Sequence, residues 1–396
     1  MSDETQFIAE TRQWLEQHCP PSLRGVTLPS ELRIWGGRQE TFPDADARRW
    51  FEAMRDKGWL APAWPRAYGG GGLSAAEARA LQRLMQQLGC PPPMMSLGIH
   101  MMGPTIMEFG NEEQKARLLP PIARGEIRWC QGYSEPGAGS DLASLQCRAV
   151  ADGDDFIVSG QKVWTSFANK SDFLFCLVRT DVNAPKHQGI SVLLIDMASP
   201  GVSSRPIELI GGSSHFCEVF LDQVRVPGAN LLGELNHGWA IAKRMLQHER
   251  NMMGQGDLGE PFDPDMVAWA RHYLGSEGDG RLANAVLRDR LVANRMQLHA
   301  VQATSDRVVA EMKAGGNGAA SSVLKCAATL ALQDKFELLL AIMGNRALGW
   351  QAGDGFTEEE IRATREWAFS KVQTIGGGTT EIQYNIIAKQ ILGLPD

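Results

Sequence analysis

The chain has 396 residues, of which 43% are hydrophobic and 21% charged, a balance typical of a globular protein and not of a disordered or fibrous one. Its net charge is −7 at pH 7, and no run of Lys and Arg is longer than two residues. The electrostatic footprint of a protein that binds nucleic acid or an anionic membrane is therefore missing.

The beginning of the chain, MSDETQFIAE, has neither a basic segment nor an apolar core, and apolar runs such as residues 338–343 are far shorter than the roughly 20 residues of a membrane span. We expect a cytoplasmic protein. The seven cysteines are odd in number, scattered and never spaced as Cys-x-x-Cys, which argues against a disulfide framework and a zinc site. We expect reduced thiols and no metal.

Up to residue 128 the apolar residues recur at three- and four-residue spacing, which predicts helices. The clearest are residues 11–18, 44–58 and 74–89. Ser74 and Glu77 form the capping-box signature at the start of the third helix. We assign residues 1–128 to an N-terminal α-helical domain.

From residue 129 the period changes to two. Short runs of β-branched and aromatic residues, separated by turn residues, occur in DFIVSGQKVWTS, SDFLFCLVRT, GISVLLIDM and CEVFLDQVRVP. They predict a middle β-domain, a barrel or sandwich, over residues 129–234. The helical period then returns and predicts a C-terminal helical bundle over residues 235–396. This α+β order has no βαβ alternation and excludes a Rossmann fold.

Near the C-terminus, the segment GGGTTEIQ spans residues 376–383. Consecutive glycines let a backbone approach a ligand closely, and Thr380 with Gln383 is a capping-box signature that would start a helix there. The free N–H groups of such a helix start suit a small anionic group. An ordinary loop that caps an ordinary helix is the alternative interpretation.

Five segments in this order resemble the acyl-CoA dehydrogenase family: YSEPGAGSDLASL, GQKVWTS, RTDVNAPKHQGISVLLIDM, FLDQVRVPGANLLGELNHGW and GGGTTEIQYNIIAKQILGLP. The resemblance covers the chain from Trp59 to Pro395. It implies a helical domain, a middle β-domain and a C-terminal four-helix bundle, with FAD between the last two. This layout agrees with the order of elements predicted from the periodicity.

The resemblance also implies which residues hold FAD. Ser134 and its neighbours would lie along the flavin, where glycines such as Gly139 let the chain bend around a flat ligand. Trp164 would cover one face of the ring. The implied cofactor-binding residues are Gln131, Tyr133, Ser134, Gly139, Ser140, Trp164, Thr165, Ser166, Gly376, Gly377, Gly378, Thr379 and Glu381. A polar β-turn around Ser134 and a plain buried tryptophan are the alternatives.

Many family members carry a catalytic glutamate at the position of Gly377, and glycine cannot accept a proton. Glu249 is the candidate replacement, because a helix through GWAIAKRMLQHERNMMG places it in one stripe with Ala242 and Met245. Burial raises the pKa of such a carboxyl towards neutrality and so suits a general base. Glu249 and Arg250 resemble the Glu-Arg pair of the branch that includes isovaleryl-CoA and long-chain enzymes. A structural salt bridge to Arg250 is the alternative.

The implied activity is FAD-dependent α,β-dehydrogenation of an acyl-CoA thioester. Glu249 would remove the α-proton, flavin N5 would accept the β-hydride, and electrons would pass to an electron-transferring flavoprotein. A flavin ribitol hydroxyl and the N–H of Gly377 would polarise the thioester carbonyl. The implied substrate-binding residues are Ser140, Arg250 and Gly377. A homodimer or homotetramer is expected, with a mixed oligomer as the alternative.

Two FAD motifs of the family, Arg-x-x-Phe-Gly and Gln-x-x-Gly-Gly, are missing. The loosened pattern resembles a bacterial subgroup that acts on bulky branched or ring-bearing acyl-CoAs, some of whose members are two-chain complexes. Glycine at position 377 agrees with a wide substrate. Two other functions stay open: a flavin monooxygenase or oxidase on the same fold, and a non-catalytic subunit that completes the FAD site of a second chain.

Overall fold

The computed structural model describes residues 3–26, 36–212, 214–254, 262–315, 321–353 and 355–395. The chain divides into two compact units. The first consists of Met1–Ile207 and Ser214–Glu260, and the second of Glu208–Ser213 and Pro261–Asp396.

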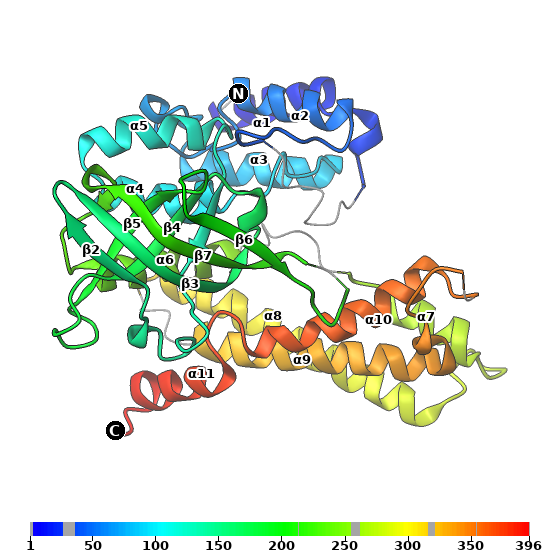
Figure 1. The fold of residues 1–396 in the computed structure, drawn as a ribbon. Helices are drawn as coiled ribbons and strands as arrows, with labels where there is room; N and C mark the ends of the chain where they lie inside the picture. The colour runs from blue at the N-terminus through cyan, green and yellow to red at the C-terminus, as the bar shows by residue number, and fades with distance from the viewer. Residues whose placement is uncertain are drawn as a thin grey trace. The chain divides into compact units, whose positions relative to one another are not determined.

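Among its described residues, the first unit begins with five α-helices (Figure 1): α1 Asp3–His18, α2 Ala45–Asp56, α3 Ala75–Leu88, α4 Gly103–Phe109 and α5 Glu112–Ala123. The three predicted helices correspond to α1, α2 and α3. The predicted capping box is confirmed, because the side chain of Ser74 accepts the N–H of Glu77 while the Glu77 carboxylate accepts the N–H of Ser74.

A sheet of eight strands follows among the described residues: β1 Trp129–Gly132, β2 Arg148–Asp152, β3 Asp155–Ser166, β4 Phe173–Arg179, β5 Ile190–Asp196, β6 Val202–Ile207, β7 Phe216–Pro227 and β8 Leu231–Leu232. The strand order is β6-β7-β3-β2-β4-β5-β8, and β1 pairs in parallel with β4. The four predicted strands correspond to β3, β4, β5 and β7. Strands β2 and β6 were not predicted because they are short and contain a single buried residue, Ala149, so neither shows a clear apolar pattern.

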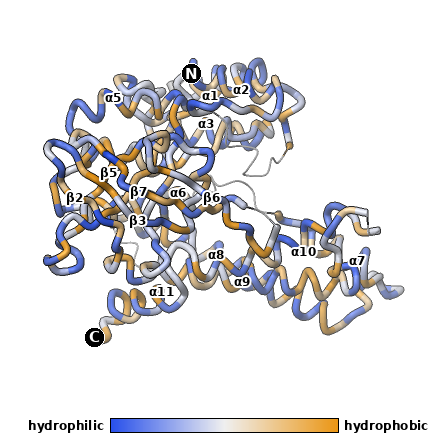
Figure 2. Tube along the Cα trace, in the orientation of Figure 1, coloured by the Kyte–Doolittle hydropathy of each residue, from blue (hydrophilic) through white to orange (hydrophobic). Residues whose placement is uncertain are grey.

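Strand β4 is buried on both faces. Phe173, Phe175 and Leu177 belong to one hydrophobic cluster, together with residues of the N-terminal helices. Leu174 and Cys176 belong to a second cluster, formed by the sheet itself. The sequence of a strand that is buried on both sides is a nearly continuous apolar run. Strands β4 and β5 have this pattern (Figure 2).

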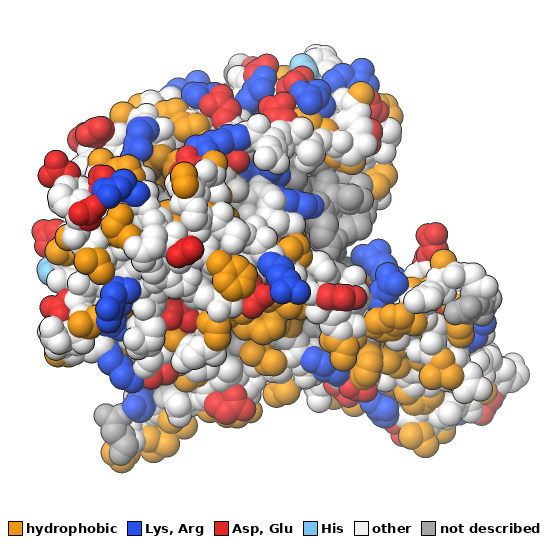
Figure 3. Space-filling model, in the orientation of Figure 1, with side chains coloured by type: hydrophobic (Ala, Val, Ile, Leu, Met, Phe, Trp, Pro, Cys, Tyr) orange, Lys and Arg blue, Asp and Glu red, His pale blue; other side chains and the backbone are white. Residues whose placement is uncertain are grey.

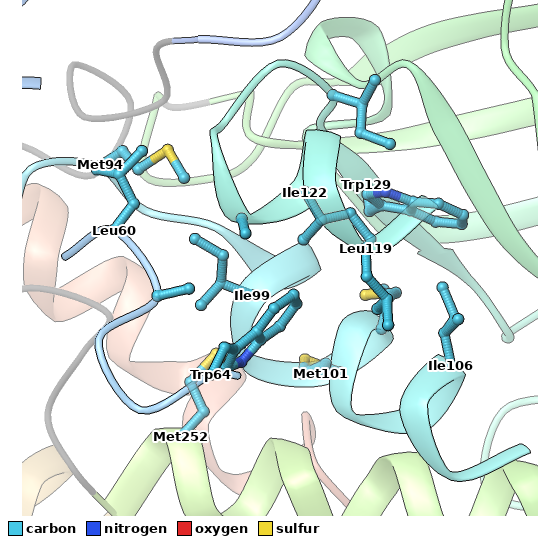
Figure 4. Close-up of a cluster of buried hydrophobic side chains, with 14 of the residues drawn as sticks. Leu60, Trp64, Met94, Ile99, Met101, Ile106, Leu119, Ile122, Trp129 and Met252 are labelled. Carbon is cyan, nitrogen blue, oxygen red and sulfur yellow. The ribbon is translucent and has the colours of Figure 1, made fainter. Parts of the chain in front are cut away.

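Helix α6, Gly238–Gly254, packs in the first unit. Its buried residues Ala242, Met245 and Met252 belong to the cluster that includes the N-terminal helices. Figure 4 shows Met252 beside Trp64 in this cluster. The predicted boundary at residues 234 and 235 separates α6 from the sheet, although α6 packs against β5 and α4. The three-domain boundaries stay a prediction.

The second unit contains the helices α7 Met266–Leu274, α8 Ala285–Lys313, α9 Ser321–Met343, α10 Glu358–Ser370 and α11 Thr380–Ile386. Helix α9 packs against the other four. The buried carboxylate of Glu360 at the start of α10 accepts from Arg346 Nε at 2.6 Å and from the Tyr273 hydroxyl at 2.8 Å.

The mixed fold confirms the predicted α+β class. All seven cysteines are buried free thiols. Lys and Arg alternate with Asp and Glu over the visible face (Figure 3), as expected for a chain without a basic run. No helix in the described part of the chain is both long enough and apolar enough to cross a membrane.

Candidate active site

The structure brings together two segments that are predicted to contact the cofactor. The first follows β1 and contains Ser134, and the second is the end of β3 with Trp164. The N–H of Val163 donates to the carbonyl of Ser134 at 2.9 Å. Residues that are about 30 positions apart in sequence therefore lie side by side in the first unit.

Trp164 has an unusual backbone. Its φ angle is 60°, in the left-handed region, and it lies where the register of β3 against β7 shifts, between Lys162 and Thr165. A bulky residue in this conformation stores strain, and such outliers occur preferentially at functional sites. Its side chain is 55% exposed, with the Phe216 ring edge-on at 6.2 Å. The alternative of a plain buried tryptophan is therefore wrong.

Two hydroxyl residues follow Trp164. Thr165 is fully buried, and its Oγ1 has no hydrogen-bond partner among the residues that the structure describes. Ser166 is half-buried. A buried hydroxyl without a partner is uncommon in folded proteins, because its desolvation is then uncompensated. The end of β3 thus combines an exposed aromatic ring with an unsatisfied hydroxyl.

The segment after Ser134 makes a tight turn, in which Glu135 and Ala138 exchange two backbone hydrogen bonds of 3.0 Å each. Gly137 and Gly139 do not have positive φ angles, and a Cβ added at either would meet no described atom within 4 Å. Neither backbone conformation nor contacts within the described chain require glycine at these two positions. The close approach of a ligand to the backbone would explain why both are glycine. Ser140 is exposed.

Tyr133 joins β1 to α6. Its side chain is only 6% exposed, and its hydroxyl donates to the carbonyl of Ala242 at 3.4 Å. Burial raises the pKa of Tyr133 well above its usual value, the charge of Glu249 raises it further, and a hydrogen bond with Gln131 acts in the opposite direction. The charge of Glu249 thus acts on Tyr133, whose hydroxyl stays neutral. The structure brings together Gln131, Tyr133 and Glu249.

Glu249 itself is half-buried on α6. It shares the helix face of the buried Ala242 and Met245, as the periodicity predicts. Arg244 on another face pairs with Glu108, with Nε 2.6 Å from Oε2. The side chain of Arg250 lies outside the described residues, so its predicted role in substrate binding stays a prediction, and the alternative of a salt bridge to Glu249 stays open.

The glycine loop belongs to the second unit. Gly377 and Gly378 have φ angles of 67° and 92°. Lys325 Nζ donates to the carbonyl of Gly378 at 2.7 Å, and Gln383 Nε2 lies 3.4 Å from the carbonyl of Gly377. Gly376 and Gly377 are exposed, and a Cβ on Gly377 would meet nothing within 4 Å.

The predicted capping box of Thr380 and Gln383 is wrong. The helix is capped by Thr379, whose hydroxyl accepts the N–H of Ile382 at 3.3 Å. The Gln383 amide instead folds back on the glycine loop. Glu381 is exposed in the first turn, where hydrogen bonds from its own N–H and from Thr379 lower its pKa.

Three residues near these segments were missed in the sequence. Lys162 forms a buried ion pair of 2.7 Å with Glu135, the residue after Ser134, and Lys325 bonds to the glycine loop. The sequence gives no clear local signal for the first pair, because β3 contains several other polar residues besides Lys162. Its partner comes from a distant segment, which periodicity does not show.

Comparison with known proteins agrees with this arrangement. The N-terminal, middle and C-terminal domains of acyl-CoA dehydrogenases match residues 1–126, 130–224 and 236–392. The three matched domains are those of a class of FAD-dependent oxidoreductases, and this class accounts for the fold and for the motifs. The chain belongs to the acyl-CoA dehydrogenase family.

The relatives have the same family name. The chain is 33% identical over 404 residues to the acyl-CoA dehydrogenase IpdE1 of Mycobacterium tuberculosis, with 100% of this chain and 99% of IpdE1 covered. It is 39% identical over 346 residues to the acyl-CoA dehydrogenase FadE34 of the same organism. This match covers 87% of this chain and 46% of FadE34. The chain thus spans about half the length of FadE34.

A solved structure described as the Tcur3481-Tcur3483 steroid ACAD has a TM-score of 0.75 and 30% identity, with 100% of this chain and 98% of that chain covered. The oxidoreductase class and the family implied by the sequence are confirmed by these matches.

Proposed function

We propose that this protein catalyses the FAD-dependent α,β-dehydrogenation of an acyl-CoA thioester to the trans-2-enoyl-CoA, with Glu249 as the base. The observation that carries the proposal is the environment of Glu249. Glu249 is half-buried on an apolar helix face. Its charge contributes to the raised pKa of Tyr133, which immediately precedes Ser134 in the chain.

The residues at the end of β3 and after β1 fit a flavin. Trp164 offers an exposed aromatic face, while Thr165 offers a hydroxyl without a partner in the described chain. Ser134 and Ser166 are half-buried and add two more hydroxyls. A flat heterocycle with a polar edge needs such a combination of stacking surface and hydrogen-bond donors. When bound, FAD supplies the acceptor for the hydride from Cβ.

Glu249 suits the removal of the α-proton. A carboxylate that is partly removed from water is a stronger base than one at the surface. Tyr133 is a neutral donor, since its pKa lies far above neutrality. Tyr133 therefore adds no competing charge beside Glu249. As the proposed base, Glu249 would take the α-proton and hold it afterwards.

The glycine loop suits polarisation of the thioester carbonyl. Side chains of Lys325 and Gln383 bond to the carbonyl groups of Gly378 and Gly377 and so restrain the loop directly after the N–H of Gly377. We assign the donor to the thioester carbonyl to this N–H. A preorganised donor of this kind stabilises the negative charge that develops on the carbonyl oxygen when the α-proton leaves.

We further propose a wide acyl group, branched or ring-bearing. The absence of a side chain at Gly377 supports it, and so does the likeness to a steroid ACAD. The description of that structure joins two protein names, which favours a second, different chain over a second copy as the partner. An electron-transferring flavoprotein is the proposed electron acceptor.

The test is anaerobic titration of the purified protein with straight, branched and ring-bearing acyl-CoAs. A yellow protein whose flavin absorbance bleaches, with formation of the enoyl-CoA, is the expected result, and the most effective substrate defines the acyl class. Two outcomes would contradict the proposal. A flavin that is reoxidised mainly by oxygen would indicate an oxidase or monooxygenase, and a chain that holds no FAD with or without a partner would indicate a non-catalytic subunit.

A further inference from the structure

Lys162 is fully buried in the middle of β3. Its Nζ donates to Glu135 Oε1 at 2.7 Å and to the carbonyl of Tyr133 at 3.2 Å. Lysine is almost never fully buried, because its ammonium group loses its hydration. A lysine in this position therefore needs an explanation beyond filling the core.

Glu135 uses both carboxylate oxygens. Oε1 accepts the N–H of Cys147 at 2.9 Å in addition to Lys162, and Oε2 accepts the N–H of Gln146 at 2.6 Å. The pair thus connects three segments: the turn after β1, the chain that enters β2, and β3. Each charge is satisfied by hydrogen bonds, which is the condition under which a buried pair persists.

The ion pair lies close in sequence to proposed flavin contacts on both segments. Glu135 follows Ser134, and Lys162 is two residues before Trp164, separated from it by Val163, whose N–H bonds to the Ser134 carbonyl. Lys162 is also the last residue before the register of β3 against β7 shifts. A slip of one residue in a strand turns every side chain to the opposite face. Lys162 holds β3 in place just before the strained Trp164.

We propose that Lys162 and Glu135 are positioning residues of the cofactor site, which hold Ser134 in a fixed place relative to Trp164 and Thr165. This inference rests on the proposed function, since it takes these three residues as flavin contacts. Two apolar side chains would fill the same volume, and such replacements of buried ion pairs are often neutral or stabilising. What they would lack is the directed bonds to the Tyr133 carbonyl and to the turn.

The experiment measures FAD affinity and folding separately. Apoprotein of the full chain is prepared for wild type, Lys162→Met, Glu135→Gln and the double variant Lys162→Met/Glu135→Leu. Melting temperature reports folding, and titration with FAD gives its dissociation constant and the flavin absorption spectrum. We expect each single variant to melt earlier, because it leaves one buried group without its partner.

The double variant decides the question. We expect it to recover the melting temperature while its FAD dissociation constant stays raised by about 10- to 100-fold, the range for groups that orient the direct contacts of a bound cofactor. Glu360→Gln is the control, since it disrupts an ion pair of the second unit whose carboxylate is buried and should lower the melting temperature without a change in FAD affinity. A double variant with wild-type FAD affinity would overturn the inference, and so would a control that lowers FAD affinity equally.

Two further variants separate this inference from the proposed function. If Ser134→Ala and Trp164→Ala weaken FAD binding but the Lys162 and Glu135 variants do not, the positioning role is wrong and the flavin site stands. If wild type binds FAD while Ser134→Ala and Trp164→Ala bind it equally well, the assigned flavin site is wrong, and the positioning role is refuted with it.

Discussion

The hydroxyl of Tyr133 donates a hydrogen bond to the carbonyl of Ala242 at 3.4 Å and so connects the end of β1 to helix α6. Ala242 and Glu249 are seven residues apart, which puts them on one face of α6. The segment predicted to hold the flavin and the helix with the proposed base are therefore joined by one buried side chain.

Removal of this hydroxyl should weaken the connection between β1 and α6. In Tyr133→Phe the carbonyl of Ala242 loses the hydrogen bond from the hydroxyl, while the ring still fills its place. A neutral hydrogen bond contributes about 0.5–1.5 kcal/mol, so the unfolding free energy should fall by about that amount, measured by chemical denaturation. An unchanged unfolding free energy would show that this bond does not stabilise the first unit.

The strained backbone of Trp164 gives a second prediction. Trp164→Gly removes both the ring and the left-handed strain, whereas Trp164→Ala removes the ring alone. The glycine variant should be more stable than the alanine variant by about 1 kcal/mol, since a left-handed residue with a Cβ costs about 1–2 kcal/mol. Both should bind FAD more weakly. Equal FAD affinity in wild type and both variants would show that the strain at Trp164 has another cause.

Lys325 should affect turnover more than binding. Its bond to the Gly378 carbonyl restrains a loop of three glycines, which have more backbone freedom than other residues. Lys325→Met should therefore lower kcat by about tenfold, the effect of about 1.4 kcal/mol of lost carbonyl stabilisation, with little change in KM. Lys325→Arg keeps a donor and should restore part of the rate. A rise in KM at constant kcat would instead assign Lys325 to substrate binding.

The stability of the second unit should depend on pH through Glu360. Hydrogen bonds from Arg346, the largest cause, lower the pKa of Glu360 to about 2, from an ordinary value of 4.5. Because the folded-state pKa is depressed, this stabilisation is present above about pH 4.5 and is lost as the pH falls towards about 2. Glu360→Gln should lower the unfolding free energy at pH 7 by about 1–3 kcal/mol, measured by denaturation, and should flatten its acid dependence. An identical acid limb in wild type and variant would contradict this role.

Much of the fold was predictable because the long elements have regular patterns. Strand β3 was predicted at its observed ends, and the Ser74 cap was recognised from two residues three positions apart. The short helices α4 and α5 carry too little periodicity, and α5 contains Pro120 and Pro121.

Parts of the site depended on contacts between distant segments and were not predictable. The helix cap is Thr379 and not Thr380, so the position three residues on is the apolar Ile382, and Gln383 bonds to the loop instead. The pairing of Lys162 with Glu135 joins positions 27 residues apart. Local periodicity has no information about such partners, although it correctly placed Glu249 on the apolar face of its helix.

The most direct test of the account is the rate of anaerobic flavin bleaching by a good acyl-CoA substrate in wild type and in Glu249→Gln. Glu108→Gln is the matched control, because Glu108 on α4 is a carboxylate that pairs with Arg244 of α6, the helix that carries Glu249. We predict that Glu249→Gln holds FAD normally but bleaches about 100- to 10,000-fold more slowly, the usual contribution of a general base, while Glu108→Gln stays near the wild-type rate. Bleaching of Glu249→Gln at the wild-type rate would show that the proton acceptor is another group.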